Sequence, residues 1–307
     1  MKTEGELAQF FSDVLAKKLA GIERIRIKTG RNRNRIIALI AIICTLLMTY
    51  FLLYDSGDLF GGIIFIMPII LCFLYIISLS LKDRYATAFK KEIIYAMVKF
   101  YDSRLTYTPD RGILPNAVEI SDLFTGAVSK SSDYVEGQLD ETFIQFSKIS
   151  LVNNGFTGIF MISSFNKYYN GNYTILQRSY TGIESLIGKV FHTIDNEILA
   201  PIKMENPDFE KEFVVFGTND IETRYIITPA FMEKMLEFRS KANNDLYISF
   251  RRSRMFLAFG TKSWNIFEPD LNKQATLEDI EQWGRALQLA IGMVEEFGLN
   301  TRIWSKQ

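Results

Sequence analysis

The sequence predicts an α+β protein in which an N-terminal transmembrane hairpin of two helices precedes an antiparallel-sheet domain with flanking helices. Two apolar runs, Ile36–Tyr54 and Leu59–Leu81, hold no charged residue over nineteen and twenty-three positions. At about 1.5 Å per helical residue, each run can cross a hydrocarbon core of about 30 Å. Beyond them, short β-rich stretches separated by turn residues replace the helical pattern. The chain therefore divides into an N-terminal arm over 1–35, the hairpin over 36–81 and a cytoplasmic α+β domain over 82–307.

Basic residues flank the outer ends of the two runs, whereas the link Asp55–Asp58 between them holds no cation. The link is too short to do more than reverse the chain direction, which makes the two helices antiparallel. The positive-inside rule then places both termini in the cytoplasm and the link outside. The cations on which this orientation depends are Lys28, Arg31, Arg33, Arg35, Lys82 and Arg84.

Composition excludes several function classes for the region after the hairpin. Residues 1–91 hold 13 Lys and Arg against 7 Asp and Glu, and residues 92–307 hold 22 against 28. A net-acidic domain argues against general nucleic-acid binding, which needs a basic face. The two cysteines lie inside the apolar runs and the chain has a single histidine, so we expect no thiolate or histidine metal centre and no cofactor.

The N-terminal arm is predicted to form a helix over residues 4–28. Apolar residues recur there at three- or four-residue spacing: Leu7, Phe11, Val14, Ile22 and Ile25. This stripe can lie on the inner leaflet, dock on the soluble domain or pair with a partner helix. Docking is favoured because aromatic and further leucine residues widen the stripe.

Helices are predicted at four places after the hairpin. The second run continues as a helix to Phe100, and a short helix follows at Glu119–Val128. After an extended stretch at Tyr225–Ile227, Thr228 caps a helix that has proline at its first position. Thr276 and Asp279 form a capping box at the start of the last helix.

About seven short strands are predicted, and the stretch from Phe156 to Ser163 is apolar on both faces and should be central in the sheet. The order of these elements is similar to that of a pleckstrin-homology-like barrel with an extra helix before the sixth strand. The other predicted strands are Tyr134–Leu139, Thr142–Val152, Tyr173–Gln177, Glu212–Thr218, Leu246–Phe250 and Met255–Phe259.

Three cations at a predicted hairpin tip, Arg251, Arg252 and Arg254, are the candidate contact for a lipid phosphate or an acidic partner. The alternative is a solvated turn. No nucleophile–base pair or phosphate-binding glycine motif occurs in the chain, so no catalytic residue is expected.

Two acidic groups are predicted to be structural. The carboxylates of Asp133, Glu136, Asp140 and Glu141 lack the spacing of a calcium loop and are expected on a solvated face. Asp220, Glu222 and Arg224 are expected to cap a helix start and to pair locally rather than to act as acids or bases.

Several runs resemble those of an uncharacterised bacterial family, the domain of unknown function 3137. They include Asp133–Gly137, Phe146–Lys148, Phe156–Phe160 with Phe165–Lys167, Phe213–Phe238, Tyr247–Phe250 and Phe267–Pro269. The similarity extends over about 75–270, and the stretch Thr228–Glu233 is its most specific part. It implies a bacterial membrane protein with two spans and a cytoplasmic domain, and LemA-type membrane proteins as partners. It implies no activity and no catalytic residue.

The sequence therefore favours a non-enzymatic, membrane-anchored binding or scaffold module that engages a membrane protein or lipid head groups. One alternative is a subunit of an oligomeric transport or envelope-stress complex, in which several uncharged hairpins would be needed to surround a path. Another is an enzyme that uses only carboxylates and lysines.

Overall fold

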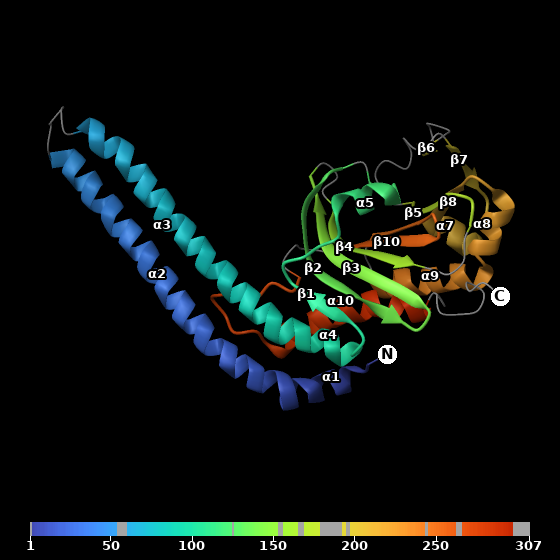
Figure 1. The fold of residues 1–307 in the computed structure, drawn as a ribbon, viewed down its shortest axis with the longest axis horizontal. Helices are drawn as coiled ribbons and strands as arrows, with labels where there is room; N and C mark the ends of the chain where they lie inside the picture. The colour runs from blue at the N-terminus through green and yellow to red at the C-terminus, as the bar shows by residue number, and fades with distance from the viewer. Residues whose placement is uncertain are drawn as a thin grey trace. The chain divides into compact units, whose positions relative to one another are not determined.

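The computed structural model describes residues 2–53, 60–124, 126–152, 156–164, 169–178, 192–194, 197–242, 245–261 and 266–296. Its contacts divide the chain into two compact units (Figure 1). The helical unit holds residues 4–96 and 268–280. The sheet unit holds residues 97–267 and 281–307 together with the first three residues. Each unit is described on its own.

In the helical unit, the N-terminal arm and the first apolar run form one uninterrupted helix. It begins as α1 (Glu4–Phe10), passes through a π-helical turn η1 (Phe11–Leu15) and continues as α2 (Ala16–Leu53). The residues on either side of the π-turn keep right-handed helical dihedrals, so the helix does not break there. The polar stretch before Ile36 is therefore helical as well.

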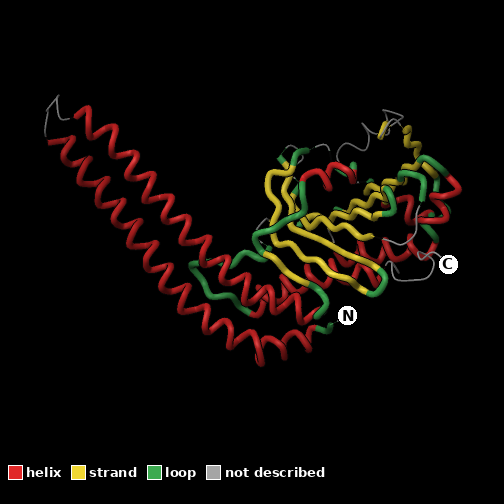
Figure 2. Tube along the Cα trace, viewed as in Figure 1, coloured by secondary structure: helices red, strands yellow, loops and turns green. Residues whose placement is uncertain are grey.

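The second long helix, α3 (Phe60–Phe89), runs antiparallel to α2 and lies beside it (Figure 2). It continues through Pro68 and is followed by a π-helical turn η2 (Lys90–Ile94) and α4 (Tyr95–Tyr101). The predicted continuation of this helix to Phe100 is confirmed.

One helix among the described residues, Gly5–Tyr50, is long and apolar enough to cross a membrane. A signal sequence near an N-terminus meets the same criteria of length and hydropathy. The second span, predicted over 59–81, is not shown by this test, and its first residue lies outside the described part of the chain.

The apolar stripe of the N-terminal arm is covered by protein only in part, since Val14 and Ile25 are 38% and 43% exposed. Leu7, Leu15, Leu19 and Ile22 are each at most 5% exposed. The arm contacts the helix that continues from α3, where Lys18 forms an ion pair of 2.7 Å with Glu92. The buried part of the stripe belongs to a segment that contacts η2 within the helical unit.

The described strands of the sheet unit form one open antiparallel sheet in the order β1-β2-β3-β4-β10-β9-β5-β8-β7-β6. The barrel analogy is wrong because β1 and β6 lie at the two edges and do not pair with each other. The short strands β1, β6 and β7 were not predicted, and neither was the N-terminal part of β2. The strands are β1 (Thr106–Thr108), β2 (Val128–Leu139), β3 (Thr142–Leu151), β4 (Thr157–Ser164), β5 (Tyr173–Gln177), β6 (His192–Ile194), β7 (Glu197–Ile202), β8 (Phe213–Gly217), β9 (Leu246–Arg251) and β10 (Arg254–Gly260).

Both faces of the central strands are buried because helices cover each side. Phe256 and its neighbours on one face join the core beneath α5 (Pro115–Ser121). On the other face, Phe250 and Phe259 contact aromatic rings of α9 (Pro229–Ala242), at centroid separations of 6.1 and 6.2 Å. This arrangement explains why β4 and its neighbours are apolar throughout.

Helix starts with a strong local signal were predicted well. Thr228 caps α9, and the capping box of Thr276 and Asp279 opens α10 (Leu277–Glu296). The helix predicted at Glu119–Val128 was wrong in position, because Pro115 begins α5 and left-handed Asp122 ends it. The extended stretch at Tyr225–Ile227 was also wrong, since the helix that Asn219 caps continues to Ile226. The remaining helices are α7 (Pro207–Glu212) and α8 (Asp220–Ile226).

Candidate functional site: a cationic cleft beside α2

The cations predicted at the ends of the apolar runs lie on the surface of the helical unit. Lys28, Arg31 and Arg35 are exposed on α2, and Lys82 and Arg84 are exposed on α3. The remaining one, Arg33, is half-buried, and its Nη2 donates a hydrogen bond of 2.7 Å to Oδ1 of Asn272. Part of this charge therefore meets a chain segment that is distant in sequence.

An open cleft of about 600 Å³ lies between α2 and that segment. One wall is the face of α2 from Arg26 to Ala38, and the other is formed by Leu271 and Asn272. Its α2 wall includes Arg31 and Arg35, which are four residues apart and so lie on the same side of the helix. We call this feature the arginine cleft.

The segment that forms the second wall is held by three contacts within the helical unit. Lys90, whose side chain is 9% exposed in the π-turn η2, pairs with Glu268 at 2.6 Å. Arg26 Nη1 donates a hydrogen bond of 3.0 Å to the carbonyl of Leu271. With the contact from Arg33, these bonds fix the cleft wall before any ligand arrives.

The arginines of the cleft differ in how their charge is balanced. Arg26 makes two hydrogen bonds, of 2.7 and 2.8 Å, to the carboxylate of Glu23. These bonds lower the pKa of Glu23 and raise the pKa of Arg26. In the described part of the chain, no ion pair neutralises Arg31 or Arg35. The cleft therefore offers two uncompensated guanidinium groups, which can bind an anion.

Of the three arginines predicted to form one contact at the β9–β10 turn, one is buried and two are exposed. Arg251 is 3% exposed, and its guanidinium donates to the carbonyl of Tyr173 at 2.8 Å and to Oγ1 of Thr174 at 2.7 Å. Arg252, in a tight turn with φ of 47°, and Arg254 are exposed. Arg251 thus ties β9 to β5, and its charge is not presented at the surface.

The four carboxylates predicted to share a solvated face at 133–141 do not share one environment. Asp133 was expected on a solvated face, but it is 1% exposed and forms an ion pair of 3.1 Å with buried Lys148. The prediction was wrong there because a register shift in β2 and a left-handed φ of 59° turn this carboxylate inward. Glu136 and Asp140 pair with Arg111 and Arg104 nearer the surface.

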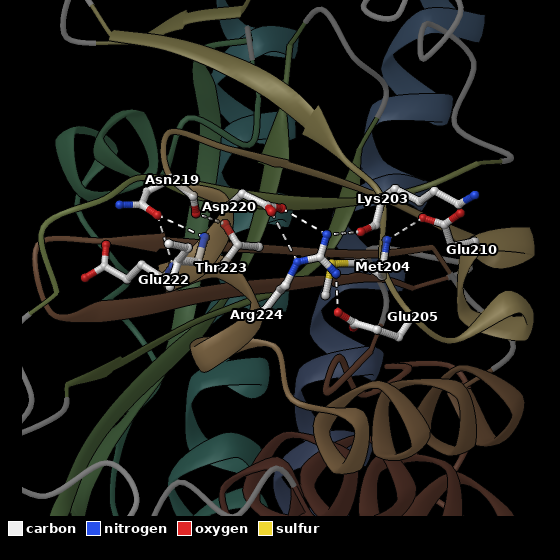
Figure 3. A network of polar contacts seen from close by, with 10 residues as sticks. Lys203, Met204, Glu205, Glu210, Asn219, Asp220, Glu222, Thr223 and Arg224 are labelled. Atoms are coloured by element: carbon white, nitrogen blue, oxygen red, sulfur yellow. Dashed lines mark hydrogen bonds and ion pairs between the residues drawn. The ribbon is translucent and has the colours of Figure 1, made fainter.

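A polar network around Arg224 links α8 to the chain that precedes α7 (Figure 3). Arg224 donates to both carboxylate oxygens of Asp220, to the carbonyl of Lys203 at 2.7 Å and to Glu205. Asn219 caps α8 by accepting from two backbone N–H groups. The geometry agrees with the expected local pairing of Asp220 and Arg224.

Glu222 has a different role from its neighbours. Its carboxylate accepts hydrogen bonds from the backbone N–H groups of Asn170 and Gly171 and from the hydroxyl of Tyr173. It therefore fixes the turn that leads into β5. The expectation that Glu222 pairs locally was wrong, because its partners lie 49 to 52 residues earlier in the chain.

Sequence reasoning found the cations of α2 but missed the second wall of the arginine cleft. Leu271 lies 245 residues from Arg26 along the chain. The one local signal is Lys90, a lysine placed between the buried residues Phe89 and Ile93. A lysine in an apolar stripe implies a carboxylate partner, although it does not identify Glu268.

In the comparison with family models, residues 154–299 match. The matched model is DUF3137, described as a protein of unknown function. The resemblance that the sequence suggested is confirmed over this range, whereas the runs quoted from before residue 154 lie outside it. The comparison with curated proteins gives no match.

Among solved structures, the chain is similar to the mycobacterial trehalose monomycolate transport factor A, TtfA. The sequence identity is 11%, the match covers 63% of this chain and 92% of that one, and the TM-score is 0.38. A likeness at this score supports no statement about fold or function. The family match is the firmer result: residues 154–299 form a DUF3137 domain, a family whose function is unknown.

Proposed function

We propose that this protein is a non-enzymatic, membrane-anchored module whose cytoplasmic domain binds a membrane protein or lipid head groups. The observation that carries the proposal is the exposed apolar surface of the helical hairpin. Leu46 and Met48 on α2 are 64% and 66% exposed, and Ile69 and Phe73 on α3 are 68% and 63% exposed. Apolar surface of this extent on both helices needs a lipid or protein environment.

The proposed anchor has two spans, with both termini in the cytoplasm of a bacterial inner membrane. Hydropathy supports the first span directly, and the second rests on the uncharged run over 59–81 and on the exposed side chains of α3. The cations at 28–35 and 82–84 lie at the same border on both helices, as the positive-inside rule requires. The family resemblance makes a LemA-type membrane protein the proposed partner.

Cysteine labelling tests this topology in a background in which Cys44 and Cys72 are replaced by alanine. In spheroplasts, a membrane-impermeant maleimide should label Ser56→Cys in the link between the runs. It should label Ser129→Cys in the sheet unit only after permeabilisation. The intact mass should retain the first 50 residues, because an anchor is not cleaved.

The opposite labelling pattern would reverse the orientation, and loss of the N-terminal segment would identify a signal sequence. Either result overturns the proposal. Extraction of the wild-type protein by alkaline carbonate would overturn it too, since an inserted hairpin resists that treatment.

Native mass spectrometry of the full-length protein, gently extracted from its own membranes, separates the binding module from the oligomeric alternative. We expect a monomer or dimer that carries a co-purified protein or lipid. A ring of defined stoichiometry would favour a transport or scaffold complex, because one hairpin without charged residues cannot line a path. A bound nucleotide or metal would favour the enzyme alternative.

A further inference from the structure

We propose that the arginine cleft binds the phosphate group of an anionic membrane lipid at the border between α2 and the bilayer. The inference rests on the proposed anchor, because it needs α2 to enter the membrane near Ile36. It names a ligand and a site that the binding module would use.

The charges of the cleft suit a phosphate. Arg31 and Arg35 lie one helical turn apart on the same wall, and no ion pair to described residues neutralises them. A guanidinium presents paired N–H donors that match the oxygens of a phosphate. Arg26 already forms an ion pair with Glu23, so Arg31 and Arg35 are the arginines that would bind the phosphate.

The second wall supplies an oriented amide. Asn272 Oδ1 accepts the hydrogen bond from Arg33, which leaves the Nδ2 hydrogens of Asn272 as donors. Because Arg26 and the Lys90–Glu268 pair hold the same segment, this amide is positioned without the ligand. A prepared site loses less conformational entropy when it binds.

The position of the cleft favours a lipid over a free phosphate. The cleft begins at Arg26 and ends at Ala38, inside the uncharged run that starts at Ile36. Ile37 and Leu39, beside its end, are 48% and 47% exposed. A lipid can thus place its phosphate at the arginines and its acyl chain along this apolar surface.

Gly30 allows the cleft to be filled without changing its charge. Gly30 lines the cleft, and a Cβ built there would meet only the carbonyl of Leu271, at 3.8 Å. Gly30→Ala should therefore leave the cleft open. Gly30→Leu should occupy it while every arginine stays in place.

The experiment compares phosphatidylglycerol with phosphatidylcholine bound to the full chain. The protein is placed in mixed nanodiscs and released for native mass spectrometry. We expect the wild type to retain phosphatidylglycerol about tenfold more than phosphatidylcholine. The double variant R31Q/R35Q and the single variant Gly30→Leu should each lose this preference.

Matched controls test whether the effect belongs to the cleft. K82Q/R84Q removes two exposed cations from the same membrane border but none from the cleft, so its preference should stay within about threefold of the wild type. Gly30→Ala should behave like the wild type. Inorganic phosphate, added to nanodiscs that contain phosphatidylglycerol, should not displace the lipid.

Three results would overturn the inference. Equal losses in R31Q/R35Q and K82Q/R84Q would indicate general attraction to an anionic surface. An unchanged preference in R31Q/R35Q and Gly30→Leu would show that the cleft is not the site, and displacement by inorganic phosphate would assign it to a free anion. Carbonate extraction of each variant keeps the two proposals separate, because an inserted protein without lipid preference contradicts only this inference.

Discussion

Replacing Lys148 by methionine should destabilise the sheet unit by about 3–5 kcal/mol, because it leaves a buried carboxylate without its counter-charge. Lys148 and Asp133 are both 0% exposed in their side chains, and Nζ lies 3.1 Å from Oδ2. Lys148 also donates to the carbonyl of Ile266, and Asp133 accepts from the hydroxyl of Tyr107 at 2.5 Å. Urea unfolding of the full chain in detergent micelles measures the loss through tryptophan fluorescence, which includes that of buried Trp283.

Two further variants test whether the loss comes from the unpaired buried charge or from removing a lysine in general. Lys211→Met removes a lysine that pairs with Asp208 on the surface, where both side chains are more than 70% exposed, and should leave the stability nearly unchanged. In D133N/K148M the unpaired charge is gone, so most of the stability should return. Asparagine also tolerates the left-handed backbone at 133. A loss below about 1 kcal/mol in Lys148→Met would contradict the buried pair.

The second large effect is alkaline unfolding between about pH 10 and 12, which follows from a group of tyrosines. Burial raises the pKa of Tyr85, Tyr101 and Tyr134 from 10.0 to about 12. Burial raises the pKa of Tyr169 and Tyr173 further, and the hydrogen bond from Tyr173 to Glu222 adds to it. The folded protein therefore keeps phenol protons that the unfolded chain loses above pH 10.

The sign of this effect follows from proton binding. Below pH 10 both states hold the proton and the stability is complete. Above it the unfolded chain binds fewer protons, so each such tyrosine lowers the free energy of unfolding by up to about 1.4 kcal/mol per pH unit. Several tyrosines together can remove the roughly 5–15 kcal/mol that stabilise a domain.

Tyrosinate absorbance and circular dichroism, recorded together against pH, test this prediction. The absorbance change of the tyrosines with a raised pKa should coincide with cooperative unfolding. Tyr134→Phe should reduce the alkaline pH slope of stability, because it removes one of the phenols whose pKa burial raises. Ionisation of these buried tyrosines in a protein that stays folded would contradict it.

Local patterns predicted those elements whose signals lie within a few residues. The β9–β10 hairpin, central β4 and the starts of α9 and α10 depend on alternation, a proline or a capping box, all visible in the sequence. The order of the sheet could not be predicted. β5 pairs with β9 on one side and β8 on the other, and no local pattern specifies partners so far apart in the chain.

The candidate site was predictable in the same partial way. The arginines of α2 follow from composition at the end of an apolar run. Their partners Leu271 and Asn272 depend on the tertiary fold, which returns the chain to α2 after β10. Asp133 illustrates the opposite error, since a group of four carboxylates was expected on a solvated face and a register shift in β2 turned this one inward.

The uninterrupted helix from Glu4 to Leu53 has a mechanical consequence. At about 1.5 Å per residue its path is about 75 Å long and bends toward α1 (Figure 2), and a bilayer core can enclose only about 30 Å of it. On the proposed topology, the rest is a stiff lever rather than a linker. A tilt of the enclosed part by about 10°, well inside the range observed for transmembrane helices, would move the far end by at most about 8 Å. A change in bilayer thickness that tilts the helix would then move the N-terminus of the helical unit.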